Sequence, residues 1–201
     1  MKILEFNFKK EISASRSAIM WNYWDHEHLI VVHNNYVDAK IIYENNYSAA
    51  YILSFKLPVL SFIKSNSLNV MIMEDKNTIK HFNSGLFQIP VHTTVKVDEI
   101  RTDHSTIEIK YEIFLQGWRK LLSFFISGMV KKWNDSVWME DLPLKLRRTK
   151  VQRIGFKDFI GLPKNIKDRK VEGEVNFELP LNRHIDSPVN IKKKDTIKLN
   201  D

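Results

Sequence analysis

The sequence contains no cysteine among its 201 residues. This absence excludes disulfide bonds, zinc sites with thiolate ligands, cysteine nucleophiles and iron–sulfur clusters held by cysteine. It also agrees with a cytoplasmic location, which we expect for the chain. No apolar run reaches the roughly 20 residues that cross a bilayer, and the first residues lack the apolar segment of a secretory signal. We therefore expect no transmembrane segment.

The chain also lacks the common nucleotide-binding and catalytic motifs. It has no P-loop, no GxGxxG turn, no GxSxG elbow and no HExxH helix. Its net charge of +7 favours anionic partners. The basic residues are spread along the chain, however, without a signature of nucleic-acid recognition. We therefore expect a solvated basic surface and no nucleic-acid partner.

Hydrophobic residues make up 43% of the chain, which is enough for the core of one folded domain. Alternating residues over 2–12 predict a strand, and helical spacing over 13–33 predicts one helix or two short ones, with Ser13 and Ser15 as N-cap candidates. Residues 117–150 predict a long amphipathic helix, in which Pro143 should start a new segment or produce a kink. Five strand-like runs lie between the helical regions, at 47–57, 68–74, 78–82, 91–100 and 106–115.

This order of elements resembles the helix-grip fold of the START/Bet v 1-like superfamily, also called SRPBCC. The resemblance implies an α+β fold in which a curved antiparallel sheet wraps around a long C-terminal helix and encloses an apolar cavity. We expect this domain to span residues 1–162. The polar residues 163–201 should form an extended or partly disordered tail, with one possible added strand at 171–179.

The segment Trp21–His33 concentrates three histidines and two carboxylates. Imidazole and carboxylate groups are the ligands of mononuclear iron and zinc sites. His28 and His33 flank an apolar run that should be buried, and a buried histidine needs a partner such as a metal ion. A cluster of cationic side chains that stabilises the end of a helix remains the alternative.

The spacing Asp25-x2-His28-x4-His33 resembles the iron-binding motif in the catalytic domain of Rieske-type ring-hydroxylating oxygenases. That catalytic domain is itself a helix-grip domain. The resemblance implies that His28 and His33 bind one Fe(II) ion. It also implies that Asp25 lies behind the ligands, where it accepts a hydrogen bond from a ligand histidine. The third ligand should come from the long C-terminal helix.

Two neighbouring acids on that helix, Asp141 and Glu140, are the candidates for the third ligand. The oxygenase pattern favours Asp141, which precedes an apolar and basic run, whereas a helical wheel places Glu140 on the apolar face. A kink at Pro143 would change this phase, so we rank Asp141 first and Glu140 second. The alternative for either acid is a solvated side chain that pairs with Lys145.

The resemblance implies an oxidoreductase that acts on a hydrophobic or aromatic molecule in the cavity. Because the sequence has no cysteines for a Rieske cluster, electrons would have to come from a separate protein or from the substrate. The alternative is a START-like carrier of an apolar ligand, without a metal. The side chains that we expect to line the cavity are Trp21, Trp24, Phe125, Met129 and Trp133.

Overall fold

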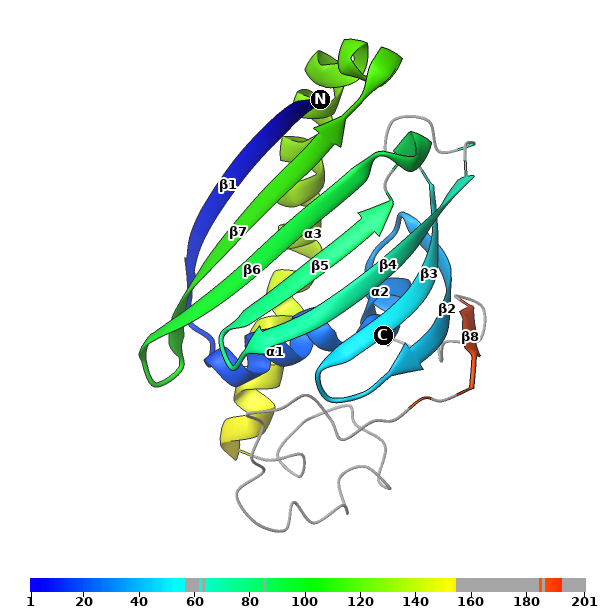
Figure 1. Cartoon of the computed structure of the whole chain (residues 1–201). Coiled ribbons are helices and arrows are strands. Elements are labelled where there is room, and N and C mark those ends of the chain that lie inside the picture. The colour runs from blue at the N-terminus through cyan, green and yellow to red at the C-terminus, as the bar shows by residue number, and fades with distance from the viewer. Residues whose placement is uncertain (57–61, 63, 85, 155–184, 186, 193–201) are drawn as a thin grey trace.

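The computed structural model describes residues 1–56, 62, 64–84, 86–154, 185 and 187–192 (Figure 1). Eight strands form one antiparallel sheet in the order β1-β7-β6-β5-β4-β3-β2-β8. The strands are β1 (Lys2–Ile12), β2 (Tyr36–Glu44), β3 (Ser48–Lys56), β4 (Lys64–Asp75), β5 (Thr78–Ser84), β6 (Pro90–Arg101), β7 (His104–Leu115) and β8 (Val189–Lys192). The helices are α1 (Arg16–Trp24), α2 (His26–Val32), η1 (Leu86–Gln88), η2 (Gly117–Leu122) and α3 (Ser123–Ile154).

The helix α3 lies along one face of the curved sheet, while α1 and α2 lie near one end of it (Figure 1). This arrangement confirms the predicted α+β helix-grip fold. The strands alternate as the sequence indicated, most clearly in β3, where buried residues face the helix side. These buried residues are Ala49, Tyr51, Leu53 and Phe55. Among the described residues, no helix has the length and apolar character of a membrane span.

The predicted helical region at 13–33 contains two short helices. Ser15 is the N-cap of α1, because its side chain accepts a hydrogen bond from the backbone nitrogen of Ala18 at 3.3 Å. Asp25 then interrupts the helical path with an extended backbone conformation. Its Oδ1 accepts a hydrogen bond from the backbone nitrogen of His28 at 3.4 Å, at the start of α2. The break at Asp25 therefore sets the direction in which α2 presents its histidines.

The long helix α3 continues through Pro143 over 32 residues. Of the two outcomes expected at Pro143, the start of a new segment does not occur, and a kink stays a prediction. Proline removes one backbone hydrogen bond of a helix, but the buried face of α3 extends on both sides of it. That face includes Ile126, Asn134, Asp141, Lys145, Arg148 and Thr149. Packing along this face outweighs the local cost of one proline.

The chain returns to the sheet near its C-terminus. The strand β8 pairs antiparallel with β2, and Ile185 forms an isolated bridge with Glu44. The strand that we expected at 171–179 lies outside the described residues. The proposed domain boundary at 162 also lies outside them, and the character of the tail therefore stays a prediction. In the described part, the segment after residue 184 contributes an edge strand to the sheet.

Candidate metal centre and cavity

A cavity of about 280 Å³ lies between the sheet and α3. Its lining is mainly apolar and aromatic, which suits a hydrophobic molecule. Of the predicted pocket residues, Phe125, Met129 and Trp133 line it from α3.

Trp21 and Trp24 do not occur among the described residues that line this cavity. Trp24 is 2% exposed and packs into the main hydrophobic core. The ring of Trp21 lies 4.2 Å from the guanidinium carbon of Arg148. On the short helix α1, the same apolar spacing serves core packing and a cation–π contact rather than the cavity wall. The expectation that these two rings line the pocket is therefore corrected.

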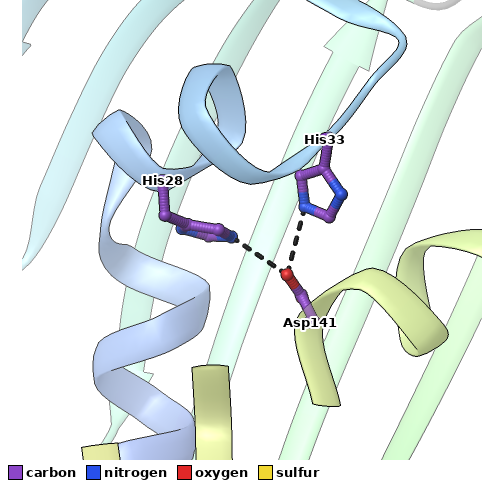
Figure 2. A group of neighbouring side chains, drawn as sticks. All are labelled: His28, His33 and Asp141. Atoms are coloured by element: carbon purple, nitrogen blue, oxygen red, sulfur yellow. Dashed lines mark ion pairs between the residues drawn. The ribbon is translucent and has the colours of Figure 1, made fainter. Parts of the chain in front are cut away.

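His28, His33 and Asp141 all line this cavity. Figure 2 shows that the two histidine rings and the Asp141 carboxylate point toward one another. His28 belongs to α2, His33 follows directly after α2, and Asp141 extends from α3. Asp141 Oδ1 lies 3.4 Å from His28 Nε2 and 3.2 Å from His33 Nε2. All three residues are buried. One ligand atom from each of them lies within 4.8 Å of the others, which is the arrangement of a candidate metal site.

Hydrogen bonds on the far side of each ring fix the histidine tautomers. His33 Nδ1 donates to Glu140 Oε2 at 2.7 Å, and His28 Nδ1 donates to the backbone oxygen of Asp25. A carbonyl and a carboxylate can only accept, so each Nδ1 carries a proton. In the neutral form of either ring, Nε2 then directs a lone pair toward Asp141 Oδ1. In the described part of the chain, neither His28 Nε2 nor Asp141 Oδ1 has a hydrogen-bond partner. A cation between these atoms would satisfy them all.

The second carboxylate oxygen of Asp141, Oδ2, is held by two hydrogen-bond donors other than the histidines. Asp141 Oδ2 accepts hydrogen bonds from Asn22 Nδ2 at 3.1 Å and from Lys145 Nζ at 3.0 Å. Burial opposes ionisation of Asp141, but the contacts with His28, His33 and Lys145 outweigh it and hold its pKa well below the usual range. The carboxylate is therefore charged, and its Oδ1 points at the histidines in a fixed orientation.

Glu140 lies outside this group of three. Its Oε2 accepts from His33, its Oε1 accepts from Asn34 Nδ2 at 3.2 Å, and its side chain is 20% exposed. The helical wheel placed Glu140 on the apolar face with Phe125, Met129 and Trp133, but in the structure Glu140 is partly exposed and is not one of the three convergent residues. The buried polar stripe of α3 passes through Asn134, Asp141 and Lys145 instead. Glu140 orients His33 from behind, whereas Asp141 occupies the position that we ranked first for a ligand.

Asp25 lies behind His28, as the motif implied, but it contacts the ring through its backbone oxygen rather than its carboxylate. The carboxylate forms an ion pair with Arg148, whose side chain is 9% exposed. Burial of Asp25 opposes its ionisation, but the charge of Arg148 outweighs it and lowers the pKa of Asp25. Arg148 Nη1 also donates to Asn22 Oδ1 at 3.4 Å, so Asn22 connects the two acids.

The sequence analysis assigned no role at the site to Asn22 and Arg148. It named Lys145 only as the partner of a solvated acid, yet the pair with Asp141 is buried: Lys145 is 1% exposed and lies 4.7 Å from the centre of the Tyr23 ring. The sequence spacing could have placed Lys145 and Arg148 near the site, because they follow Asp141 by four and seven residues and lie on the same face of the helix. Their partners on α1 are more than 100 residues away in sequence, so the pairing itself could not be predicted.

Comparisons with known proteins support the fold and leave the chemistry open. No family model matches the chain, and no curated protein matches it. Similar solved structures include Ara h 8.0201, with 12% identity, a TM-score of 0.60 and coverage of 73% of this chain and 99% of that one. The Zhui aromatase/cyclase from Streptomyces sp. R1128 has 6% identity, a TM-score of 0.60 and coverage of 76% and 96%.

A START superfamily protein from Mycobacterium smegmatis is also similar, with 8% identity, a TM-score of 0.58 and coverage of 71% of this chain and 97% of that one. The chain therefore has the fold of START/Bet v 1-like proteins. At these identities the likeness establishes the fold alone. The resemblance to Rieske-type oxygenases gains no support from these matches, and it rests on the Asp25-x2-His28-x4-His33 spacing and the geometry around it.

Proposed function

We propose that the chain binds one divalent transition-metal ion, Fe(II) in the first place, through His28, His33 and Asp141. In this proposal it acts as an oxygenase-like oxidoreductase on a hydrophobic molecule in the adjoining cavity. The observation that supports the proposal is the convergence of two histidine Nε2 atoms on Asp141 Oδ1, at 3.4 and 3.2 Å. Two histidines and one carboxylate are the donor set of non-haem Fe(II) sites.

The distances agree with ligation of one small ion. Metal–ligand bonds of about 2.1 Å at roughly right angles place neighbouring ligand atoms about 3 Å apart. The separations of 3.4 and 3.2 Å are close to this value, so small side-chain adjustments would suffice. When bound, Fe(II) would supply open coordination positions for O2 or for substrate. Glu140 and the Asp25 carbonyl hold the rings, while Lys145 and Asn22 hold the carboxylate.

An oxygenase also needs a source of electrons. The chain offers no cysteine for an iron–sulfur cluster, so a separate electron-transfer protein or the substrate itself would supply them. The apolar cavity wall would bind the hydrophobic substrate and keep bulk water from the site.

The second candidate function is a carrier of an apolar ligand, which the size and apolar lining of the cavity favour. Protons would then replace the metal between the histidines and Asp141. Burial opposes a charged His33, but the neighbouring carboxylates of Asp141 and Glu140 outweigh that effect and raise the pKa of His33. The cluster would then consist of ion pairs with a structural role.

Metal content separates the two functions. The full chain is purified without oxygen, supplied with Fe(II) or Zn(II), desalted and analysed for metal by mass spectrometry. We expect about one ion per chain, and a loss of at least tenfold in metal affinity for His28→Ala, His33→Ala and Asp141→Asn. His92→Ala is the matched control, because His92 lies between the rings of Phe82 and Phe114 and does not line the cavity.

Circular dichroism of each variant establishes that it is folded before its metal content is compared. A wild-type chain that retains neither metal would contradict the proposed function and leave the carrier as the answer. Equal metal content in the wild type and all three site variants would place the ion elsewhere. If one iron per chain is retained, oxygen consumption with hydrophobic substrates and an added reductant tests the oxidoreductase activity.

A further inference from the structure

Several polar residues of the sheet line the cavity, and four of them lie together on β4, β5 and β6: Asn69, His81, Asn83 and Thr93. The strand register makes them neighbours, because Asn69 pairs with Asn83 across β4 and β5, and His81 pairs with Thr93 across β5 and β6. Residues directly opposite each other on one sheet face are in contact range. We refer to these four residues as the polar strip. Burial of polar groups is costly, so a cluster of them calls for a reason.

Hydrogen bonds determine what His81 can offer to a ligand. The amide nitrogen of Asn69 donates to the backbone oxygen of Ser67 at 2.7 Å, which leaves Asn69 Oδ1 as an acceptor for His81 Nε2 at 3.0 Å. His81 Nε2 therefore carries the proton, and Nδ1 is an acceptor. Among the described residues, none forms a hydrogen bond with His81 Nδ1.

The side chains of Asn83 and Thr93 are also available to hydrogen-bond with a ligand. No hydrogen bond joins the side chain of Asn83 or Thr93 to another residue in the described part of the chain. The strip thus presents one imidazole acceptor, one primary amide and one hydroxyl to the same cavity.

The polar strip is electrically neutral. Burial lowers the pKa of His81 to about 4, so its ring is uncharged at neutral pH. Amides and hydroxyls do not ionise, and burial also raises the pKa of the neighbouring Tyr51 hydroxyl. The polar strip offers no opposite charge to a ligand carboxylate or ammonium group. It offers both a hydrogen-bond donor and an acceptor to a neutral oxygen group of a ligand.

We infer that the polar strip recognises the neutral hydroxyl or carbonyl group of an otherwise apolar ligand. A ligand hydroxyl donates to His81 Nδ1 and accepts from Asn83 Nδ2, and a ligand carbonyl accepts from Asn83 Nδ2 or the Thr93 hydroxyl. The inference rests on the proposed binding of a hydrophobic molecule in the cavity, and it narrows that molecule to oxygenated hydrophobic compounds. Because the strip and the candidate metal ligands line one cavity, it also fixes the ligand's orientation.

The test compares ligands that differ in one group: 2-naphthol, 2-methylnaphthalene and 2-naphthoate. Their dissociation constants for the full-length chain are measured by titration calorimetry at pH 7. We expect 2-naphthol to bind about three- to tenfold more tightly than 2-methylnaphthalene, since a neutral hydrogen bond distinguishes them. The variants His81→Phe and Asn83→Leu should each reduce this preference, and the double variant should remove it.

His92→Phe is the control, because it places the same substitution on the same sheet but outside the cavity lining. It should retain the wild-type preference. Unfolding temperatures establish that all variants are folded, and either single variant suffices if the other does not fold.

Equal affinity of the wild type for 2-naphthol and 2-methylnaphthalene would overturn the inference. So would tighter binding of 2-naphthoate, a preference that persists in the double variant, or no binding of any of the three. The readout does not depend on metal, so its result is separable from that of the proposed function. If the chain binds iron but shows no preference for 2-naphthol, only the inference about the polar strip is refuted. If the chain binds no metal but prefers 2-naphthol, only the proposed metal site is refuted.

Discussion

At the scale of residues, the candidate metal site is built from charges that are balanced in pairs. Lys145 pairs with Asp141 and Arg148 pairs with Asp25, and Asn22 bonds to both pairs. Each buried cation thus has a carboxylate partner, buried in Asp141 and partly exposed in Asp25, which offsets the cost of removing the cation from water. Asp141 is therefore oriented before any metal arrives, and such preorganisation favours ligation in a defined geometry.

His81 should make the stability of the protein depend on pH. Its pKa is lowered to about 4 by burial, below the value of 6.5 for a free histidine. Above pH 6.5 the ring is neutral in both the folded and unfolded states. As the pH falls from there towards 4, the unfolded chain binds a proton that the folded protein does not, and the free energy of unfolding decreases by roughly 2–3 kcal/mol.

The contribution of His81 is measured by urea unfolding at pH 7.5 and at pH 5, with His81→Phe beside the wild type. The variant should lose less stability between these two pH values than the wild type does. His92→Phe serves as the comparison and should behave as the wild type. An equal decrease in the wild type and in His81→Phe would show that His81 binds its proton normally in the folded protein.

At the scale of elements, periodicity predicted α3 but not its details. The three-and-four spacing of apolar residues located the helix, and the strand runs located β3 to β7 within a few residues. Local patterns could not decide between Asp141 and Glu140, because that depends on how α3 is rotated against α1 and α2. Contacts between distant segments fix this rotation, and a wheel drawn from one helix does not contain them.

Pro143 provides a test of what holds α3 together. It is exposed within a continuous helix and removes one backbone donor. Pro143→Ala should restore that hydrogen bond and raise the free energy of unfolding by about 1–3 kcal/mol. Urea unfolding at neutral pH measures the change. A decrease in stability would mean that the packing of the buried face depends on a backbone adjustment at Pro143.

At the scale of the whole molecule, the final described strand lies far in sequence from its partner. The pairing of Val189–Lys192 with Tyr36–Glu44 joins the end of the chain to a sheet that the first 115 residues otherwise form. No local pattern pairs an edge strand with a partner about 150 residues away, and the polar composition after residue 163 indicated a tail. The pairing of β8 with β2 depends on contacts between distant segments, which the local sequence pattern does not contain.

A truncation tests the contribution of this strand. A chain that ends at Arg183 lacks both the bridge of Ile185 to Glu44 and the four pairs between β8 and β2, from Ile41–Val189 to Asp38–Lys192. Loss of these contacts should lower the unfolding temperature by about 5 °C. The uncovered edge of β2 should also promote self-association at high concentration, because unpaired strand edges pair with other chains. A chain that ends at Lys192 keeps β8 and should match the full-length protein in both measurements. If both truncated chains unfold at the wild-type temperature, β8 adds nothing to the stability of the sheet.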